Sequence, residues 1–132
     1  PSLATSHGPN VVPATAPVQF DPPALHRSIA RLLAANPEVL YLTHYGAVRE
    51  PARIAQQLLR QIDAMVAASR EHAQAPDRHA RLKKAFRDIY VNELRRSGST
   101  LDEATLDKLL ATDIELNAQG AGVWLDRQSR KA

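Results

Sequence analysis

The sequence THYG at residues 43–46 contains the side chain with the clearest potential for chemistry, His44. It follows an apolar run at residues 39–42, which predicts a buried strand, and it precedes a helical pattern that opens near Pro51. We therefore expect His44 at the mouth of a strand-to-helix turn, where α/β proteins commonly carry metal ligands and catalytic groups. A hydrogen-bonded structural histidine is the competing interpretation.

The other histidines do not complete a metal site by their spacing. His7 lies in a proline-rich arm, His26 near the start of the first predicted helix, and His72 and His79 on either side of a helix-helix turn, and we interpret all four as solvated surface residues. A catalytic zinc ion needs about three protein ligands and an open position. The sequence has no HxH or HExxH spacing and no cysteine, so a metal would depend on histidine or carboxylate ligands.

The length and composition of the chain limit the classes of protein to which it can belong. At 132 residues the chain can bury one modest core. No apolar run approaches the roughly 18 residues needed to span a bilayer, and no signal peptide is visible, so we expect a soluble, cytoplasmic protein without a membrane partner. Because the chain opens on Pro1 and its only methionine is Met65, we expect a piece of a longer protein, with a removed initiator as the alternative.

Charge is segregated along the chain, although the formal net charge is only +3. Residues 70–96 are rich in arginine and lysine, whereas residues 102–115 are rich in aspartate and glutamate. We expect the two segments to form adjacent helices that pair through their charges. Binding of nucleic acid by the basic helix is a weaker alternative, because Asp88 and Glu93 interrupt the basic face and aromatic residues are sparse.

The first half of the chain predicts an arm, a helix and a strand. Residues 1–23 hold six prolines, which predicts an extended arm lying against other protein, with disorder as the alternative. Asp21 should cap a helix that ends at the Asn36-Pro37 pair. Residues 38–43 form the only convincing strand, and their near-continuous apolarity predicts burial on both faces. Its partner strands would come from the arm, a second copy or sequence absent from this chain.

The second half predicts helices. Apolar residues recur at helical spacing over residues 51–73 and again over residues 82–94, where Gly98 should terminate the second helix. We interpret Tyr90 and Trp124 as anchors of a core or an interface rather than as ligand-stacking residues.

Two further helical segments complete the chain. Thr100 and Glu103 fit a capping box that opens a short helix. Residues 112–129 should form another helix, despite Gly120 and Gly122, each of which costs about 1 kcal/mol relative to alanine in a helix interior. Such glycines are plausible where another backbone packs closely, and a helix break is the alternative.

Beyond these patterns, residues 13–46 (PATAPVQFDPPALHRSIARLLAANPEVLYLTHYG) resemble the C-terminal part of bacterial, glyoxalase-II-like hydrolases of the metallo-β-lactamase fold. In that family the last strand of the second sheet commonly ends in T-H-[YF]-G, whose histidine is the final metal ligand, and His44 matches this position. The stretch at residues 113–126 also resembles the C-terminal helical extension of such hydrolases.

The resemblance implies an α/β fold class: the C-terminal part of an αββα sandwich followed by a helical extension, with this chain mostly α. Residues 1–50 would be the C-terminal piece of the sandwich, containing the arm, the helix and the last strand with its metal-ligand turn. Residues 51–132 would be the helical extension. The family's HxHxDH segment, middle histidine and bridging aspartate have no counterpart here, so the missing N-terminal part of the same hydrolase would be the partner of this chain.

The resemblance also implies a chemistry for the intact protein. Two metal ions, expected to be zinc, would share a hydroxide that attacks a small-molecule ester, thioester or amide. His44 would hold the second ion as a neutral imidazole. The alternative function is a helical protein-interaction or dimerisation module without catalytic activity, in which His44 is structural and the chain forms a homodimer.

Overall fold

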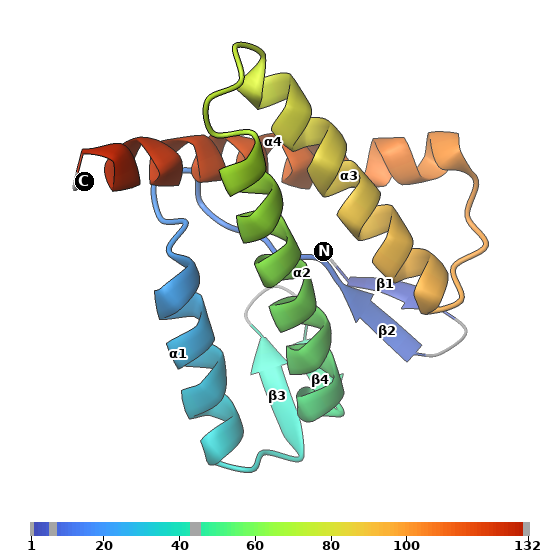
Figure 1. The fold of residues 1–132 in the computed structure, drawn as a ribbon. Helices are drawn as coiled ribbons and strands as arrows, with labels where there is room; N and C mark the ends of the chain where they lie inside the picture. Colours follow the sequence, from blue (N-terminus) through green and yellow to red (C-terminus); the bar gives the residue numbers. More distant parts are fainter. Residues whose placement is uncertain (1, 6–7, 43–45, 131–132) are drawn as a thin grey trace.

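The computed structural model describes residues 2–5, 8–42 and 46–130. The described chain is mostly helical with two small antiparallel strand pairs, and its elements follow in the order β1 (Ser2–Thr5), β2 (Gly8–Val11), α1 (Pro22–Ala34), β3 (Val39–Leu42), β4 (Gly46–Arg49), α2 (Pro51–Glu71), α3 (Arg78–Arg96) and α4 (Glu103–Ser129). Figure 1 shows α4 crossing the upper parts of α2 and α3, with α1 on the other side of α2. Within the described segments, no helix combines the length and the apolarity needed to cross a membrane.

The helix α1 begins where the sequence predicts. The Asp21 Oδ1 atom accepts a hydrogen bond from the Ala24 backbone N–H at 3.1 Å, and Pro22 occupies the first turn, where a missing N–H does no harm. After the helix, Asn36 takes a positive φ of 48°. Of the residues of α1, Pro22 is the one that is buried, and Leu32 is 53% exposed. The apolar stripe of α1 is therefore only partly covered.

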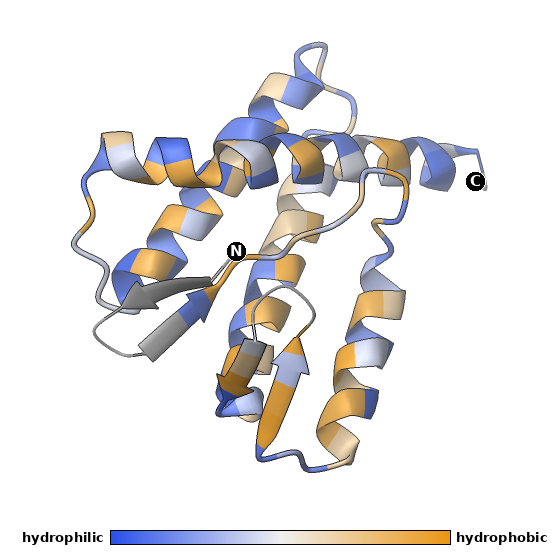
Figure 2. Cartoon of the chain, turned by 180° about the vertical axis from the view of Figure 1, so that it is seen from behind, coloured by the Kyte–Doolittle hydropathy of each residue, from blue (hydrophilic) through white to orange (hydrophobic). Residues whose placement is uncertain are grey.

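The prediction that the strand at residues 38–43 is buried on both faces is wrong for this chain. In β3, Tyr41 is 82% exposed and Leu42 is 38% exposed. Its partner strand is β4, with Leu42 opposite Gly46 and Val39 opposite Arg49. The sequence GAVR of β4 gives too little apolar signal to predict a strand, which is why this partner was missed. Figure 2 shows the apolar β3 next to α1, with neither strand covered by a further layer on that side.

The N-terminal arm packs against the helices. This agrees with the prediction of an extended arm that lies against other protein. Its backbone forms the β1–β2 pair, with Ser2 opposite Val11. Further along the arm, Val12 and Phe20 are 5% and 1% exposed and belong to the main hydrophobic cluster. The alternative of a disordered arm is wrong for residues 10–20.

The core lies between α2, α3 and α4. Its fully buried members include Met65 of α2, Leu82 and Phe86 of α3, and Leu106 and Leu110 of α4. Tyr90 is also fully buried and Trp124 is 7% exposed, so both are core anchors, as predicted.

The helix α3 ends as the sequence predicts. Gly98 adopts a φ of 82°, and the Ser99 backbone N–H donates to the Leu94 carbonyl oxygen at 2.9 Å. The left-handed glycine and the hydrogen bond back to the last turn form a common helix stop.

The last two predicted helices are a single helix, α4. Asp102, rather than Thr100, is its N-cap, because the Asp102 Oδ1 atom accepts from the Thr105 backbone N–H at 2.9 Å. The helix continues through Gly120, where an added Cβ would lie 3.3 Å from the Phe20 Cβ and 3.4 Å from the Pro17 carbonyl oxygen. The arm therefore passes close to α4 at Gly120, as the presence of glycine there suggested.

The helices α3 and α4 pair through their charges, also as predicted. Arg87 contacts both Glu103 and Asp107, the latter at 2.6 Å, and Lys83 Nζ lies 2.8 Å from Glu115 Oε2. Hydrogen bonds from Lys83 and Gln119 lower the pKa of Glu115 to about 2. Lys83 and Arg87 on the basic face of α3 are thus paired with the acidic part of α4, whereas Arg81 and Lys84 pair with Asp77 and Asp88.

Candidate functional site

His44 lies outside the described residues, but the elements on both sides of it are defined. Leu42 ends β3 and Gly46 begins β4, and the two residues are paired. Gly46 has a φ of 75°, and an ideal Cβ there would meet no atom within 4 Å. Glycine is therefore favoured at position 46 for its backbone conformation rather than for lack of space. Because β4, which begins at Gly46, lies between His44 and α2, the predicted strand-to-helix turn is wrong: the next element is a strand.

An apolar groove of about 250 Å³ begins next to the end of β3. The arm, α1, β3 and α2 all contribute to its walls, which are lined by Val11, Val12, Pro13, Ala14, Thr15, Leu25, Ile29, Leu42, Ile54, Leu58 and Ile62. Leu42 immediately precedes the THYG sequence, so this groove is the concave surface nearest in sequence to His44. Its lining suits an apolar protein segment or the apolar body of a small molecule.

Two buried asparagines hold the arm that forms one wall of this groove. Asn117 Nδ2 donates to the Pro13 carbonyl oxygen and to the Tyr90 hydroxyl, both at 2.7 Å, while its Oδ1 accepts from the Thr15 hydroxyl at 2.7 Å. Asn10 Nδ2 donates to the Ser97 hydroxyl at 2.6 Å. Neither asparagine was singled out from the sequence, because a buried polar residue in a helix or an arm has no periodic signature.

The described residues do not themselves fit a metal ion. No group of three or more histidine, aspartate or glutamate side chains capable of holding a metal occurs among residues 2–5, 8–42 and 46–130. His26 Nε2 lies 2.8 Å from Asp63 Oδ1, and His79 Nε2 lies 3.1 Å from Glu115 Oε1. These two histidines are half-exposed and engaged with carboxylates, which agrees with their interpretation as surface residues. A zinc site would require His44 and donors from outside the described segments.

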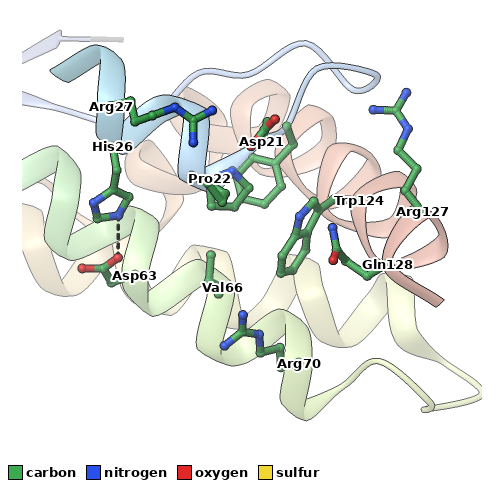
Figure 3. Close-up of a pocket in the computed structure, with 12 residues that line it drawn as sticks. Asp21, Pro22, His26, Arg27, Asp63, Val66, Arg70, Trp124, Arg127 and Gln128 are labelled. Carbon is green, nitrogen blue, oxygen red and sulfur yellow. Dashed lines mark hydrogen bonds and ion pairs between the residues drawn. The ribbon is translucent and has the colours of Figure 1, made fainter. Parts of the chain in front are cut away.

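A second concave region was missed altogether by reasoning from the sequence. We call it the arginine groove: a surface between α1, α2 and α4 that contains Arg27, Arg70 and Arg127 around Trp124 (Figure 3). Each arginine comes from a different helix, and they lie far apart in the sequence. Only the packing of the helices brings them to one surface, so no local motif could have revealed the groove.

Comparison with known proteins does not assign either site. No family model, curated protein or solved structure matches this chain.

Proposed function

We propose that this chain is the C-terminal portion of a cytoplasmic, metal-dependent hydrolase of the metallo-β-lactamase fold. His44 contributes the last ligand of a two-zinc site, and the substrate is a small-molecule ester, thioester or amide. The observation that carries the proposal is the THYG sequence at residues 43–46, which follows a capped helix and a strand in the order typical of that family. Residues 1–50 belong to the sandwich and residues 51–132 form its helical extension.

The incomplete sheet supports this proposal. A sheet of only two strands is marginally stable by itself and needs further strands or a covering layer. In the two-stranded sheet of β3 and β4, the aromatic side chain of Tyr41 is 82% exposed. Added strands and a facing sheet from the N-terminal part of the hydrolase would cover β3, as in an αββα sandwich.

The partly covered apolar surface of α1 gives further support. Leu25 and Ile29 border the apolar groove beside β3, and Leu32 is 53% exposed. In an αββα sandwich, the apolar stripe of such a helix packs on the outer face of a sheet. The missing N-terminal part of the same hydrolase is therefore the partner for which this surface is suited.

The metal ions would supply Lewis-acid chemistry when bound. Since the described residues lack a donor set, no reaction step is assigned to them. His44 would bind as a neutral imidazole, so metal affinity should fall when the pH is low enough to protonate it.

The test is the metal content of the intact protein that contains this chain. We expect His44→Ala to lose one of two zinc ions, measured by mass spectrometry of the purified protein, with an unchanged circular dichroism spectrum. His26→Ala is the matched control, because His26 is a half-exposed histidine held by Asp63. Unchanged zinc content in His44→Ala would refute the ligand assignment.

One observation favours the alternative of a dimerisation module. Leu109 and Leu116 of α4 are 45% and 38% exposed, and their spacing of seven residues places them on one face of the helix. Sedimentation equilibrium of the chain, with Leu109→Asp as the variant, tests it. A dimer that Leu109→Asp dissociates, together with zinc content that does not depend on His44, would establish the module and exclude the hydrolase.

A further inference from the structure

The arginine groove has the size and the mixed lining of a small-molecule site. Its volume is about 600 Å³, within the range of roughly 300–1,000 Å³ typical of ligand pockets. Phe20, Pro22, Val66 and Trp124 give it apolar walls, and the polar groups lie around these. Figure 3 shows Trp124 among the residues that line the groove, with Arg70 on one side of its ring and Arg127 on the other side, extending away from it.

The three arginines of this groove are not paired with any described carboxylate, although Asp21 and Asp63 also line it. Arg27, Arg70 and Arg127 make no ion pair with any residue in the described part of the chain. The two carboxylates in the lining are already engaged: Asp21 caps α1, and Asp63 contacts His26 at 2.8 Å. The three guanidinium groups therefore keep their hydrogen-bond donors available.

Arginines that line other cavities differ in this respect. Arg60, in the cavities between α2 and α3, contacts Glu93 Oε1 at 2.6 Å. Arg78, in a cavity between α3 and α4, contacts Asp126 Oδ1 at 2.9 Å. Both of these arginines contact a carboxylate, whereas none of the three exposed arginines of the arginine groove does so within the described residues.

Arg70 is held in a way that leaves it able to bind a ligand. Its guanidinium carbon lies 5.9 Å from the centroid of the Trp124 ring, within the range of a cation–π contact. Phe20 packs edge-on against the same ring, with centroids 5.9 Å apart. An arginine attracted to a ring face still presents N–H donors at its edge, in the planar geometry that matches a carboxylate or a phosphate.

We propose that the arginine groove binds a small organic anion. Its carboxylate or phosphate group is held by Arg70 beside Trp124, with Arg27 and Arg127 adding positive charge, and its apolar body lies against Phe20, Pro22 and Val66. The site is independent of His44 and of any metal, and it applies whether the chain is part of a hydrolase or an interaction module.

Trp124 makes a direct test possible, because it is the only tryptophan in the sequence and lies in the groove. Its fluorescence is followed while the chain is titrated with sodium phosphate, glycerol 3-phosphate or succinate, each against sodium chloride at equal ionic strength. We expect a saturable change with at least one of the three anions and none with chloride. Tighter binding of the phosphates would assign a phosphate ligand, and tighter binding of succinate a carboxylate ligand.

Variants separate the groove from general electrostatics. We expect Arg70→Gln to weaken the apparent affinity at least tenfold and Arg127→Gln to weaken it by a smaller factor, both with an unchanged circular dichroism spectrum. Arg81→Gln is the control: it removes an exposed arginine of α3 that contacts Asp77, outside the groove, and should leave the affinity unchanged. His44→Ala should also leave it unchanged, which separates this proposal from the metal site.

Two results would overturn the proposal. One is the absence of any saturable response to the three anions beyond that to chloride. The other is an affinity that Arg70→Gln changes no more than Arg81→Gln does.

Discussion

The helices α2, α3 and α4 bury large apolar side chains in a common core. The segment from α1 to β4 leaves large apolar side chains exposed. The three helices enclose a continuous core in which Leu82, Phe86 and Leu110 are fully buried. The segment from α1 to β4 leaves Leu32 and Tyr41 more than half exposed. One chain thus contains a region with a well-buried core and a region whose largest apolar side chains remain exposed. The second region is where a partner is to be expected, and the proposed sandwich would provide one.

The largest expected effect on stability comes from substituting one leucine in each of the two regions and comparing the costs. Leu82→Ala removes a fully buried side chain of α3 and should lower the free energy of unfolding by about 2–5 kcal/mol. Leu32→Ala removes a half-exposed side chain of α1 and should change it by no more than about 0.5 kcal/mol. Urea denaturation of the chain measures both, and equal costs would show that α1 is as well packed as the helices.

A second substitution defines how far the well-packed region extends into the arm. Asn117→Ala should cost about 3 kcal/mol, because the Pro13 carbonyl, the Thr15 backbone N–H and the Tyr90 hydroxyl all lose a buried partner. Amide hydrogen exchange should also accelerate at Thr15, whose N–H donates to Asn117 Oδ1.

Thr112→Ala is the control for that substitution, since Thr112 is an exposed residue of the same helix. Loss of stability without faster exchange at Thr15 would mean that the arm is held by other contacts, such as those of Phe20.

Substitutions at the two glycines of α4 should have smaller effects on the free energy of unfolding, and the two effects should differ. Gly122→Ala should raise the free energy of unfolding by about 1 kcal/mol, because alanine favours the helix and the added Cβ would meet only the flexible end of Arg78, at 3.8 Å. Gly120→Ala should gain less or lose stability, since the added Cβ would press on Phe20 and on the arm backbone at Pro17. Equal gains in thermal unfolding would show that the arm is not closely packed against α4.

Local signals in the sequence predicted most of the helices, and the failures have physical causes. The cap at Asp21 and the glycine at position 98 act within a single turn, so the start of α1 and the end of α3 could be placed. The N-cap of α4 was misplaced by two residues because Asp102 competes with Thr100 for this role, and the Asp102 carboxylate is the group that accepts from the Thr105 N–H.

The sites depended more on tertiary packing than the helices did. The THYG sequence is contiguous and could be singled out, although β4 after it could not be, because a strand with few apolar residues is defined by its partner. The arginine groove depends on three helices and was invisible until they were packed together.

The smallest expected effect concerns charge. In the three-helix region, the Glu115 carboxylate has hydrogen-bond partners within the same region. Glu115 of α4 receives hydrogen bonds from Lys83 and Gln119, which lower its pKa from 4.5 to about 2. Because the pKa is lower in the folded chain, the ionised carboxylate stabilises the folded state above about pH 4.5, and this contribution is lost as the pH falls towards 2. Thermal unfolding between pH 5 and pH 2 should therefore show a decline that Glu115→Gln makes shallower.

The control for this measurement is Glu71→Gln, which removes an exposed carboxylate of α2 that has no ion pair within the described chain. Its acid decline should match that of the unmodified chain. A decline that Glu71→Gln flattens as much as Glu115→Gln does would mean that general charge repulsion, rather than the pairing of α3 with α4, governs acid stability. Because Glu115 is partly exposed, salt should screen its contribution, so the difference between the two variants should shrink at high ionic strength.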